Sequence, residues 1–96
     1  MDLRSNVWFL YVVECSDNTL YTGVTTDVSR RVHEHNTSKK GAKYTRSRRP
    51  VRVVYYDEFP DRSSALKAEH WVKKLSRKEK QQLVSSRILG LINETR

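Results

Sequence analysis

One carboxylate, Glu69, occupies a position where a hydrophobic residue is expected. Small and apolar residues of the segment 63–75 recur at helical spacing: Ala65, Ala68, Val72 and Leu75. Glu69 falls on the same stripe, and an inward carboxylate is unfavourable unless a partner satisfies it. That partner is either an arginine in a structural ion pair or a divalent cation, since Mg²⁺ often takes only one or two protein carboxylates.

Two basic side chains lie one helical turn apart in the segment 27–35. Arg31 and His35 are at positions i and i+4, so both project from the same side of a helix. By themselves they fit a solvated basic face. The histidines do not predict a zinc site, because His33 and His35 point in different directions and His70 has no partner one turn away.

Two tyrosines, Tyr11 and Tyr21, lie in separate segments that predict strands. Residues 7–15 and 20–25 flank a cluster of turn-forming residues and predict a hairpin, and residues 51–59 have the β-branched and aromatic content of a third strand. Tyrosines in such strands ordinarily pack in a core. They indicate a site only in combination with other polar groups.

Helical patterns complete the predicted order β-β-α-β-α-α. Helices are predicted over 27–35, capped by Thr26 or Asp27, and over 63–75. A last helix begins with the S-x-x-E capping pattern of Ser76 and Glu79. The apolar residues 88–92 either extend that helix or pack as a separate turn.

The predicted fold is one α+β (mixed α/β) domain over residues 1–96, with a core of about 7–80 and a C-terminal helix or tail over 81–96. Its three-stranded sheet has the first strand at the centre and helices on both faces. One cysteine, Cys15, excludes an internal disulfide. Without an apolar stretch of about 18 residues or a signal-peptide pattern at the N-terminus, we expect a cytoplasmic protein with no membrane partner.

Positive charge is concentrated in one segment. The chain has 19 Lys and Arg against 11 Asp and Glu, a net charge of +8, and residues 37–52 alone carry seven basic and no acidic groups. Residues 37–50 predict a basic loop that ends at Pro50. This loop is either a solvated segment or a nucleic-acid contact, in which its basic residues bind phosphates and Tyr44 stacks on a base. The basic residues are Lys39, Lys40, Lys43, Arg46, Arg48 and Arg49.

In combination, these residues resemble the GIY-YIG nuclease domain. The resemblance rests on Phe9-Leu10-Tyr11, on Tyr21-Thr22-Gly23 after nine intervening residues, on Arg31 eight positions beyond Gly23, and on the inward Glu69. It also covers residues 41–50 and the helix 65–74, and it looks closest to the small YhbQ-like bacterial proteins. The N-terminal domain of UvrC and the Slx-type nucleases are more distantly similar. Phe9 and Thr22 stand where the family name has Gly and Ile.

The resemblance implies a metal-dependent DNA endonuclease that leaves 5′-phosphate and 3′-hydroxyl ends, with a role in DNA repair or processing. It implies that Glu69 holds one divalent metal ion, Mg²⁺ or Mn²⁺, and that Arg31 neutralises charge on the phosphate. It implies further that Tyr11 is the general base or orients the attacking water, with Tyr21 bonded in the same pocket. His35 would assist Tyr11 or contact phosphate, and Gly23 would have a backbone role.

Tyr11 poses a chemical problem in that role. A free tyrosine has a pKa of about 10, so at neutral pH it needs a neighbouring cation, or a metal-bound hydroxide must act instead. A shared site also requires Tyr11 and Tyr21 on one sheet face. A two-residue Asp17-Asn18 turn would put them on opposite faces, so we predict a loop with an odd number of residues or a bulge.

Two other functions fit the same residues. One is a nucleic-acid-binding module of the same fold without cleavage, and the other is an interaction domain whose basic loop meets another acidic partner. Glu69 favours the nuclease over the binding module, because an inward carboxylate opposes polyanion binding unless a cation covers it. No recognition helix or arm is evident, so substrate choice is expected to depend on DNA shape, strandedness or a targeting protein. We expect a monomer.

Overall fold

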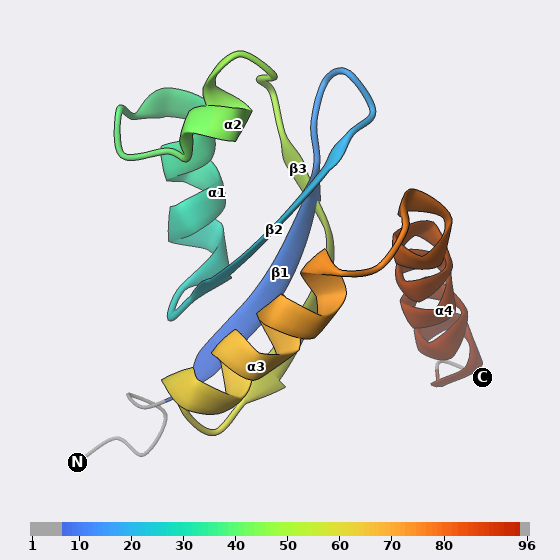
Figure 1. The fold of residues 1–96 in the computed structure, drawn as a ribbon. Helices are drawn as coiled ribbons and strands as arrows, with labels where there is room; N and C mark the ends of the chain where they lie inside the picture. Colours follow the sequence, from blue (N-terminus) through green and yellow to red (C-terminus); the bar gives the residue numbers. More distant parts are fainter. Residues whose placement is uncertain (1–6, 95–96) are drawn as a thin grey trace.

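The computed structural model describes residues 7–94, and the side chains of residues 7–86. Its elements, in chain order, are β1 (Trp8–Glu14), β2 (Leu20–Thr25), α1 (Val28–Thr37), α2 (Lys43–Arg46), β3 (Arg52–Phe59), α3 (Arg62–Lys73) and α4 (Arg77–Glu94) (Figure 1). The predicted α+β class and element order are confirmed, with one difference. The segment predicted as a loop contains the one-turn helix α2.

The sheet has the strand order β2-β1-β3, and both pairings are antiparallel. The predicted central position of the first strand is therefore confirmed. A centre position suits β1 because Leu10, Tyr11, Val12 and Val13 are all buried, so both faces of this strand are apolar. A register shift between Val12 and Val13 marks an irregularity in the pairing with β3.

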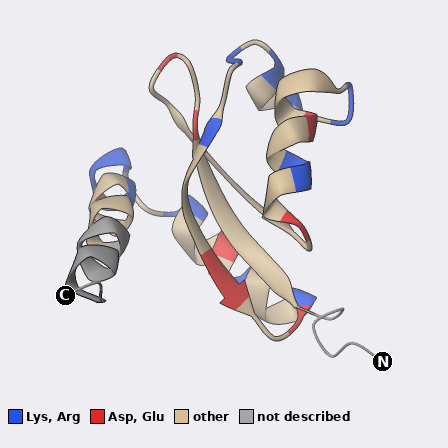
Figure 2. Ribbon diagram, turned by 180° about the vertical axis from the view of Figure 1, so that it is seen from behind, with Lys and Arg blue, Asp and Glu red and all other residues tan. Residues whose placement is uncertain are grey.

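Helices α1 and α3 pack on different faces of β1. Val28 and Val32 of α1 pack against the core that contains Tyr11 and Val13. Trp8 points to the other face by strand alternation, and the guanidinium of Arg62, at the start of α3, lies 5.6 Å from its ring centroid. Figures 1 and 2 show α3 lying against the sheet in both views.

Local hydrogen bonds explain where the helices begin. Asp27, not Thr26, is the N-cap of α1 and accepts from the amide of Arg30 at 3.0 Å. The predicted capping box is present before α4, where the amide of Ser76 donates to Glu79 Oε1 at 2.9 Å and the amide of Glu79 donates to Ser76 Oγ at 3.1 Å. Side-chain caps thus fix the directions in which α1 and α4 leave the preceding loops.

The C-terminal helix α4 continues to Glu94, so the backbone of residues 88–92 extends this helix. Arg77 at its start donates to the carbonyl of Asn18 in the β1–β2 loop at 3.1 Å. Within residues 7–94, no helix is both long enough and apolar enough to span a membrane. The expectation that no signal peptide is present concerns residues 1–6, which lie outside the described part of the chain.

Candidate active site

The hairpin register places Tyr11 and Tyr21 on one face of the sheet. Tyr11 pairs with Gly23 and Val13 pairs with Tyr21, and five residues, 15–19, connect the last pair of the ladder. An odd loop of this kind was predicted for a shared site, and the register confirms it. Asn18 closes the loop with a positive φ of 68°, a conformation that asparagine tolerates better than most residues.

Gly23 leaves room for the ring of Tyr11. A Cβ atom at this position would lie 2.6 Å from the Tyr11 hydroxyl oxygen and 2.8 Å from its Cζ. The φ angle of Gly23 is not positive, so the requirement for glycine is one of space. The group that approaches the Gly23 backbone in this structure is therefore the Tyr11 ring, which crosses towards the β2 edge.

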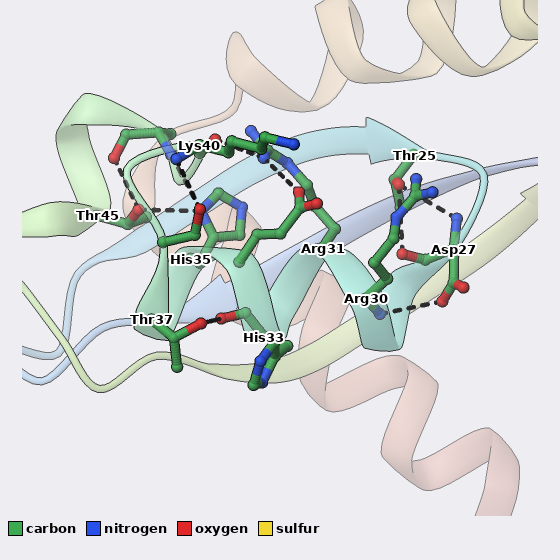
Figure 3. A network of polar contacts seen from close by, with 12 residues as sticks. Thr25, Asp27, Arg30, Arg31, His33, His35, Thr37, Lys40 and Thr45 are labelled. Atoms are coloured by element: carbon green, nitrogen blue, oxygen red, sulfur yellow. Dashed lines mark hydrogen bonds and ion pairs between the residues drawn. The ribbon is translucent and has the colours of Figure 1, made fainter.

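His35 forms the buried centre of the site. His35 is fully buried, and its Nε2 lies 2.7 Å from the hydroxyl of Tyr11, a residue that is 1% exposed. On the opposite side of the ring, Nδ1 lies 3.0 Å from Thr45 Oγ1 and 3.3 Å from the amide nitrogen of Ala42. Figure 3 shows His35 of α1 beside Thr45 of α2. The ring of Tyr21 packs edge-on against His35 at 5.3 Å.

Burial keeps the central pair uncharged at neutral pH. It raises the pKa of Tyr11 to about 12; the neighbouring Tyr21 and Glu69 act in the same direction, and a hydrogen bond and the charge of Arg31 oppose the shift. Burial, followed by the charge of Arg31, lowers the pKa of His35 to about 4. Tyr11 therefore keeps its proton and His35 is a neutral imidazole.

Arg31 is the cation beside this pair. Its Nη1 donates to Glu34 Oε1 at 3.0 Å and to the carbonyl of Lys40 at 2.7 Å (Figure 3). Burial disfavours its charge, but the hydrogen bonds to Glu34 and Tyr11 outweigh burial and raise the pKa of the guanidinium. Arg31 is therefore a fixed positive charge, held between α1 and the basic segment, residues 37–50.

Glu69 lies on α3 and acts on Tyr11 through its charge. Its carboxylate contributes to raising the pKa of Tyr11, so the two groups interact electrostatically. The side chain is 19% exposed and pairs with Lys73 at 3.5 Å, whose own side chain is 53% exposed. The expected alternative partner, an arginine, is thus replaced by a lysine one turn along the same helix.

The donor set fits a hard divalent cation that keeps most of its water. Among the described side chains, no cluster of three or more His, Cys, Asp or Glu could hold a metal ion. Mg²⁺ and Mn²⁺ prefer oxygen ligands, and Mg²⁺ often uses a single carboxylate with several waters. Glu69 provides such a carboxylate, and Lys73, whose side chain is half exposed, is its ion-pair partner.

The basic segment divides into two groups of side chains. Four cations are exposed: Lys39, Lys40, Lys43 and Arg46. Arg49, in contrast, donates through Nε to the carbonyl of His35 and through Nη2 to the carbonyl of Ser38 at 2.6 Å. It therefore satisfies carbonyls at the end of α1, whereas the other four side chains face solvent.

Tyr44 connects the basic segment with the site. Its ring stacks on Tyr21 with centroids 6.0 Å apart, and the guanidinium of Arg48 lies 3.9 Å from its centroid. Arg48 also pairs with Asp17 at 3.0 Å. The Tyr44 ring and the Arg48 guanidinium thus both have partners within the protein. Stacking of Tyr44 on a base stays a prediction.

Sequence reasoning missed Thr45, which is fully buried against His35. It is a hydroxyl residue inside a basic segment, ten positions from its partner, and no helix or strand period relates the two. The missing signal is that Thr45 belongs to a short helix, so its side chain turns inward while those of Lys43 and Arg46 turn outward.

Fold and site together define a small α+β domain with a Tyr–His–Arg cluster and a nearby carboxylate. A sequence model of the GIY-YIG catalytic domain matches residues 7–82, which include every residue of the candidate site. The chain belongs to the GIY-YIG family.

The relatives that match over most of the chain are UPF0213 proteins. UPF0213 protein DP2720 of Desulfotalea psychrophila is 56% identical over 79 residues, which cover 82% of this chain and 72% of the relative. UPF0213 protein lin0209 of Listeria innocua is 51% identical over 84 residues, which cover 88% and 92% of the two chains. The names of these relatives state no activity.

Two solution NMR structures share the fold. Protein EF2693 from E. faecalis matches with a TM-score of 0.60 and 46% identity, covering 86% of this chain and 88% of its own. UPF0213 protein BH0048 from Bacillus halodurans matches with a TM-score of 0.54 and 51% identity, covering 82% and 83%. Both support the three-stranded antiparallel sheet with flanking helices.

Proposed function

We propose that this protein is a metal-dependent DNA endonuclease that hydrolyses phosphodiester bonds to 5′-phosphate and 3′-hydroxyl ends, with a role in DNA repair or processing. The observation that carries the proposal is the buried hydrogen bond between Tyr11 and His35 at 2.7 Å. The charge of Arg31 acts on both groups, and α3 supplies a carboxylate, Glu69, that acts electrostatically on Tyr11. Membership of the GIY-YIG family supports the same chemistry.

The proposed roles follow from the charges of the side chains. Arg31 binds the scissile phosphate and stabilises the negative charge that develops on its oxygens. Tyr11, on which the charge of Arg31 acts, orients the attacking water through its hydroxyl. Tyr21 packs against His35 and Tyr44 and so holds the wall of the site.

Glu69 is the proposed ligand of one Mg²⁺ or Mn²⁺ ion. When bound, the ion supplies Lewis-acid polarisation of the phosphate and stabilisation of the leaving 3′ oxygen. Because Glu69 lies on α3, the charge of the ion would be on the α3 side of the site. The exposed cations of the basic segment hold the flanking phosphates. Without an ion, the carboxylate would repel the DNA backbone.

The test compares the purified chain with Glu69→Gln and Arg31→Ala on single-stranded, duplex and branched DNA, with Mg²⁺, Mn²⁺ or EDTA. Each variant is expected to lose cleavage by about 10²-fold or more, as when one stabilising group is removed from a transition state. Matched controls are Glu58→Gln on β3 and Arg30→Ala on α1, both exposed, which remove the same charges outside the site.

Two results contradict the proposal. Cleavage that persists equally in Glu69→Gln and Arg31→Ala places the activity at another site or in a contaminant. DNA binding without cleavage under every metal condition favours the alternative, a nucleic-acid-binding module of the same fold. In that case Glu69→Gln should tighten DNA binding, because it removes a carboxylate that repels phosphate.

A further inference from the structure

A chain of hydrogen bonds joins the basic segment to Tyr11 through His35. Tyr11 Oη lies 2.7 Å from Nε2, and Nδ1 faces both Thr45 Oγ1 at 3.0 Å and the amide nitrogen of Ala42 at 3.3 Å. The side chains of Tyr11, His35 and Thr45 are all buried, so water does not compete for these bonds. Which ring nitrogen carries the hydrogen therefore determines whether His35 donates to Tyr11 or accepts from it.

The Ala42 amide distinguishes the two tautomers. A backbone N–H can only donate, and here its acceptor is Nδ1. The Ala42 nitrogen and Nδ1 are 3.3 Å apart, so a hydrogen on Nδ1 would point at the hydrogen of the Ala42 amide. The partly buried amide would then lack an acceptor. A neutral His35 therefore carries its single hydrogen on Nε2, which points at the oxygen of Tyr11.

The Thr45 hydroxyl fits the same arrangement. Its one hydrogen has two acceptors within reach, Nδ1 at 3.0 Å and the Ala42 carbonyl at 2.9 Å. That carbonyl already accepts from the amides of Thr45 and Arg46 at 3.0 and 3.2 Å. Nδ1, with its lone pair towards Thr45, is therefore the acceptor that gains more from the hydroxyl hydrogen.

We propose that Thr45 and the Ala42 amide are positioning groups that hold His35 in its Nε2–H tautomer and thereby keep an N–H donor on the Tyr11 oxygen. His35 then cannot take the proton of Tyr11 through Nε2, because that nitrogen carries a hydrogen already. Tyr11 then accepts from His35, so its own hydroxyl hydrogen is directed away from Nε2. The catalytic consequence rests on the proposed nuclease function, whereas the tautomer does not.

The first experiment reads the tautomer directly. Long-range ¹H–¹⁵N NMR correlation of the uniformly ¹⁵N-labelled full chain at pH 7 should show His35 with a protonated Nε2 and an unprotonated Nδ1. Exposed His33 serves as the internal reference for an imidazole free to exchange between tautomers. A protonated Nδ1 in His35 overturns the proposal.

Variants at Thr45 test how far its hydroxyl determines the tautomer of His35. Thr45→Ser keeps the hydroxyl and should keep the Nε2–H pattern, while the near-isosteric Thr45→Val should shift His35 towards a mixture of tautomers. If His35 in Thr45→Val shows the same NMR tautomer pattern as in wild type, the Ala42 amide alone determines the tautomer. That result overturns the role of Thr45. Should Thr45→Val fail to fold, loss of the Nε2–H pattern in the folded Thr45→Ser protein overturns the proposal in the same way.

Kinetics separate a positioning role from a structural one. Thr45→Val is expected to lower kcat by about tenfold to a hundredfold with KM for DNA unchanged, and Thr45→Ser should restore it to within about twofold. An altered tautomer with unchanged kcat overturns the catalytic part of the inference. If wild type cleaves no DNA with any metal, the proposed function fails, and the NMR pattern still decides the tautomer.

Discussion

At the residue scale, burial outweighs charge at Tyr11. Arg31 lowers the pKa of the hydroxyl, but burial and the neighbouring Tyr21 and Glu69 raise it, and the result is a pKa of about 12. The cation that a tyrosine base requires, Arg31, is thus present. It offsets only part of the rise in the pKa of Tyr11 that burial causes. Tyr11 therefore enters the reaction protonated, which favours orientation of the water over its full deprotonation.

His35 predicts a specific pH dependence of stability. Its pKa is about 4 in the folded protein and 6.5 in the unfolded chain, so the unfolded chain binds more protons between these values. The free energy of unfolding should therefore be unaffected by His35 above pH 6.5 and fall by about 2 kcal/mol from pH 7 to pH 5. Urea unfolding at several pH values measures this slope.

The matched variants are His35→Gln and His33→Gln. Removal of the buried histidine should flatten the slope between pH 7 and pH 5, whatever its effect on absolute stability. Removal of exposed His33 should leave the wild-type slope. Equal slopes in all three proteins would show that His35 titrates normally in the folded state.

Gly23 and Tyr11 predict a coupled pair of substitutions. Gly23→Ala places a methyl group 2.6 Å from the Tyr11 hydroxyl and should destabilise the protein by about 1–3 kcal/mol, as overpacking does. In a Tyr11→Phe background the hydroxyl is absent, so the loss should be smaller by at least about 0.5 kcal/mol. A double-mutant cycle of thermal or urea unfolding checks this, and strict additivity would contradict the contact.

At the element scale, Arg49 holds the end of α1 and the basic segment together. Its guanidinium donates to carbonyls of His35 and Ser38, which α1 leaves without intrahelical partners. Gly41 packs against the same end, where a Cβ would lie 2.9 Å from the carbonyl oxygen of Glu34. The basic segment is therefore anchored to α1 before any ligand binds.

Arg49→Ala is expected to lower the free energy of unfolding by about 2 kcal/mol, because hydrogen bonds from a charged group contribute about 1.5–3 kcal/mol. The control, Arg46→Ala, removes an exposed arginine from α2 and should change stability by less than about 0.5 kcal/mol. Urea unfolding followed by circular dichroism gives both values. Equal losses for the two variants would remove the distinction between anchoring and ligand-facing arginines.

At the scale of the whole molecule, charge is separated along the fold. Figure 2 shows basic residues on α1, the following loop and α2, while the far end of β3 is acidic. The Tyr11–His35 pair lies between β1 and α1, next to the basic end. A bound nucleic acid is thus expected to lie along the α1–α2 side with its phosphates on the exposed cations.

Salt dependence tests this orientation. Replacement of Lys39, Lys40 and Lys43 by glutamine should reduce the slope of log binding constant against log salt concentration by about 2–3, since each phosphate contact contributes about 0.7–0.9. The matched control replaces three exposed lysines with the same loss of charge: Lys67 on α3, Lys74 at the C-cap of α3 and Lys78 on α4. Equal slopes for the two triple variants, measured by fluorescence anisotropy, would contradict a dedicated contact surface.

Short-range patterns in the sequence were sufficient for the framework of the molecule. Apolar, β-branched and aromatic runs between turn-forming residues predicted the strands and the central position of β1. Helical periods predicted the helices that carry Arg31, His35 and Glu69, and S-x-x-E predicted the start of α4. The demand that Tyr11 and Tyr21 share a face was enough to predict an odd hairpin loop. These features depend on neighbours within a few positions, which is why the sequence alone determined them.

Tertiary structure alone decided how the site is held. The contact of Thr45 with His35, the anchoring of α1 by Arg49 and the close approach of the Tyr11 ring to Gly23 join residues ten or more positions apart. A basic residue in a loop looks the same in sequence whether it faces solvent or bonds to a helix end. Only the path of the folded chain distinguishes them, because burial and hydrogen-bond partners are set by which segments return to each other.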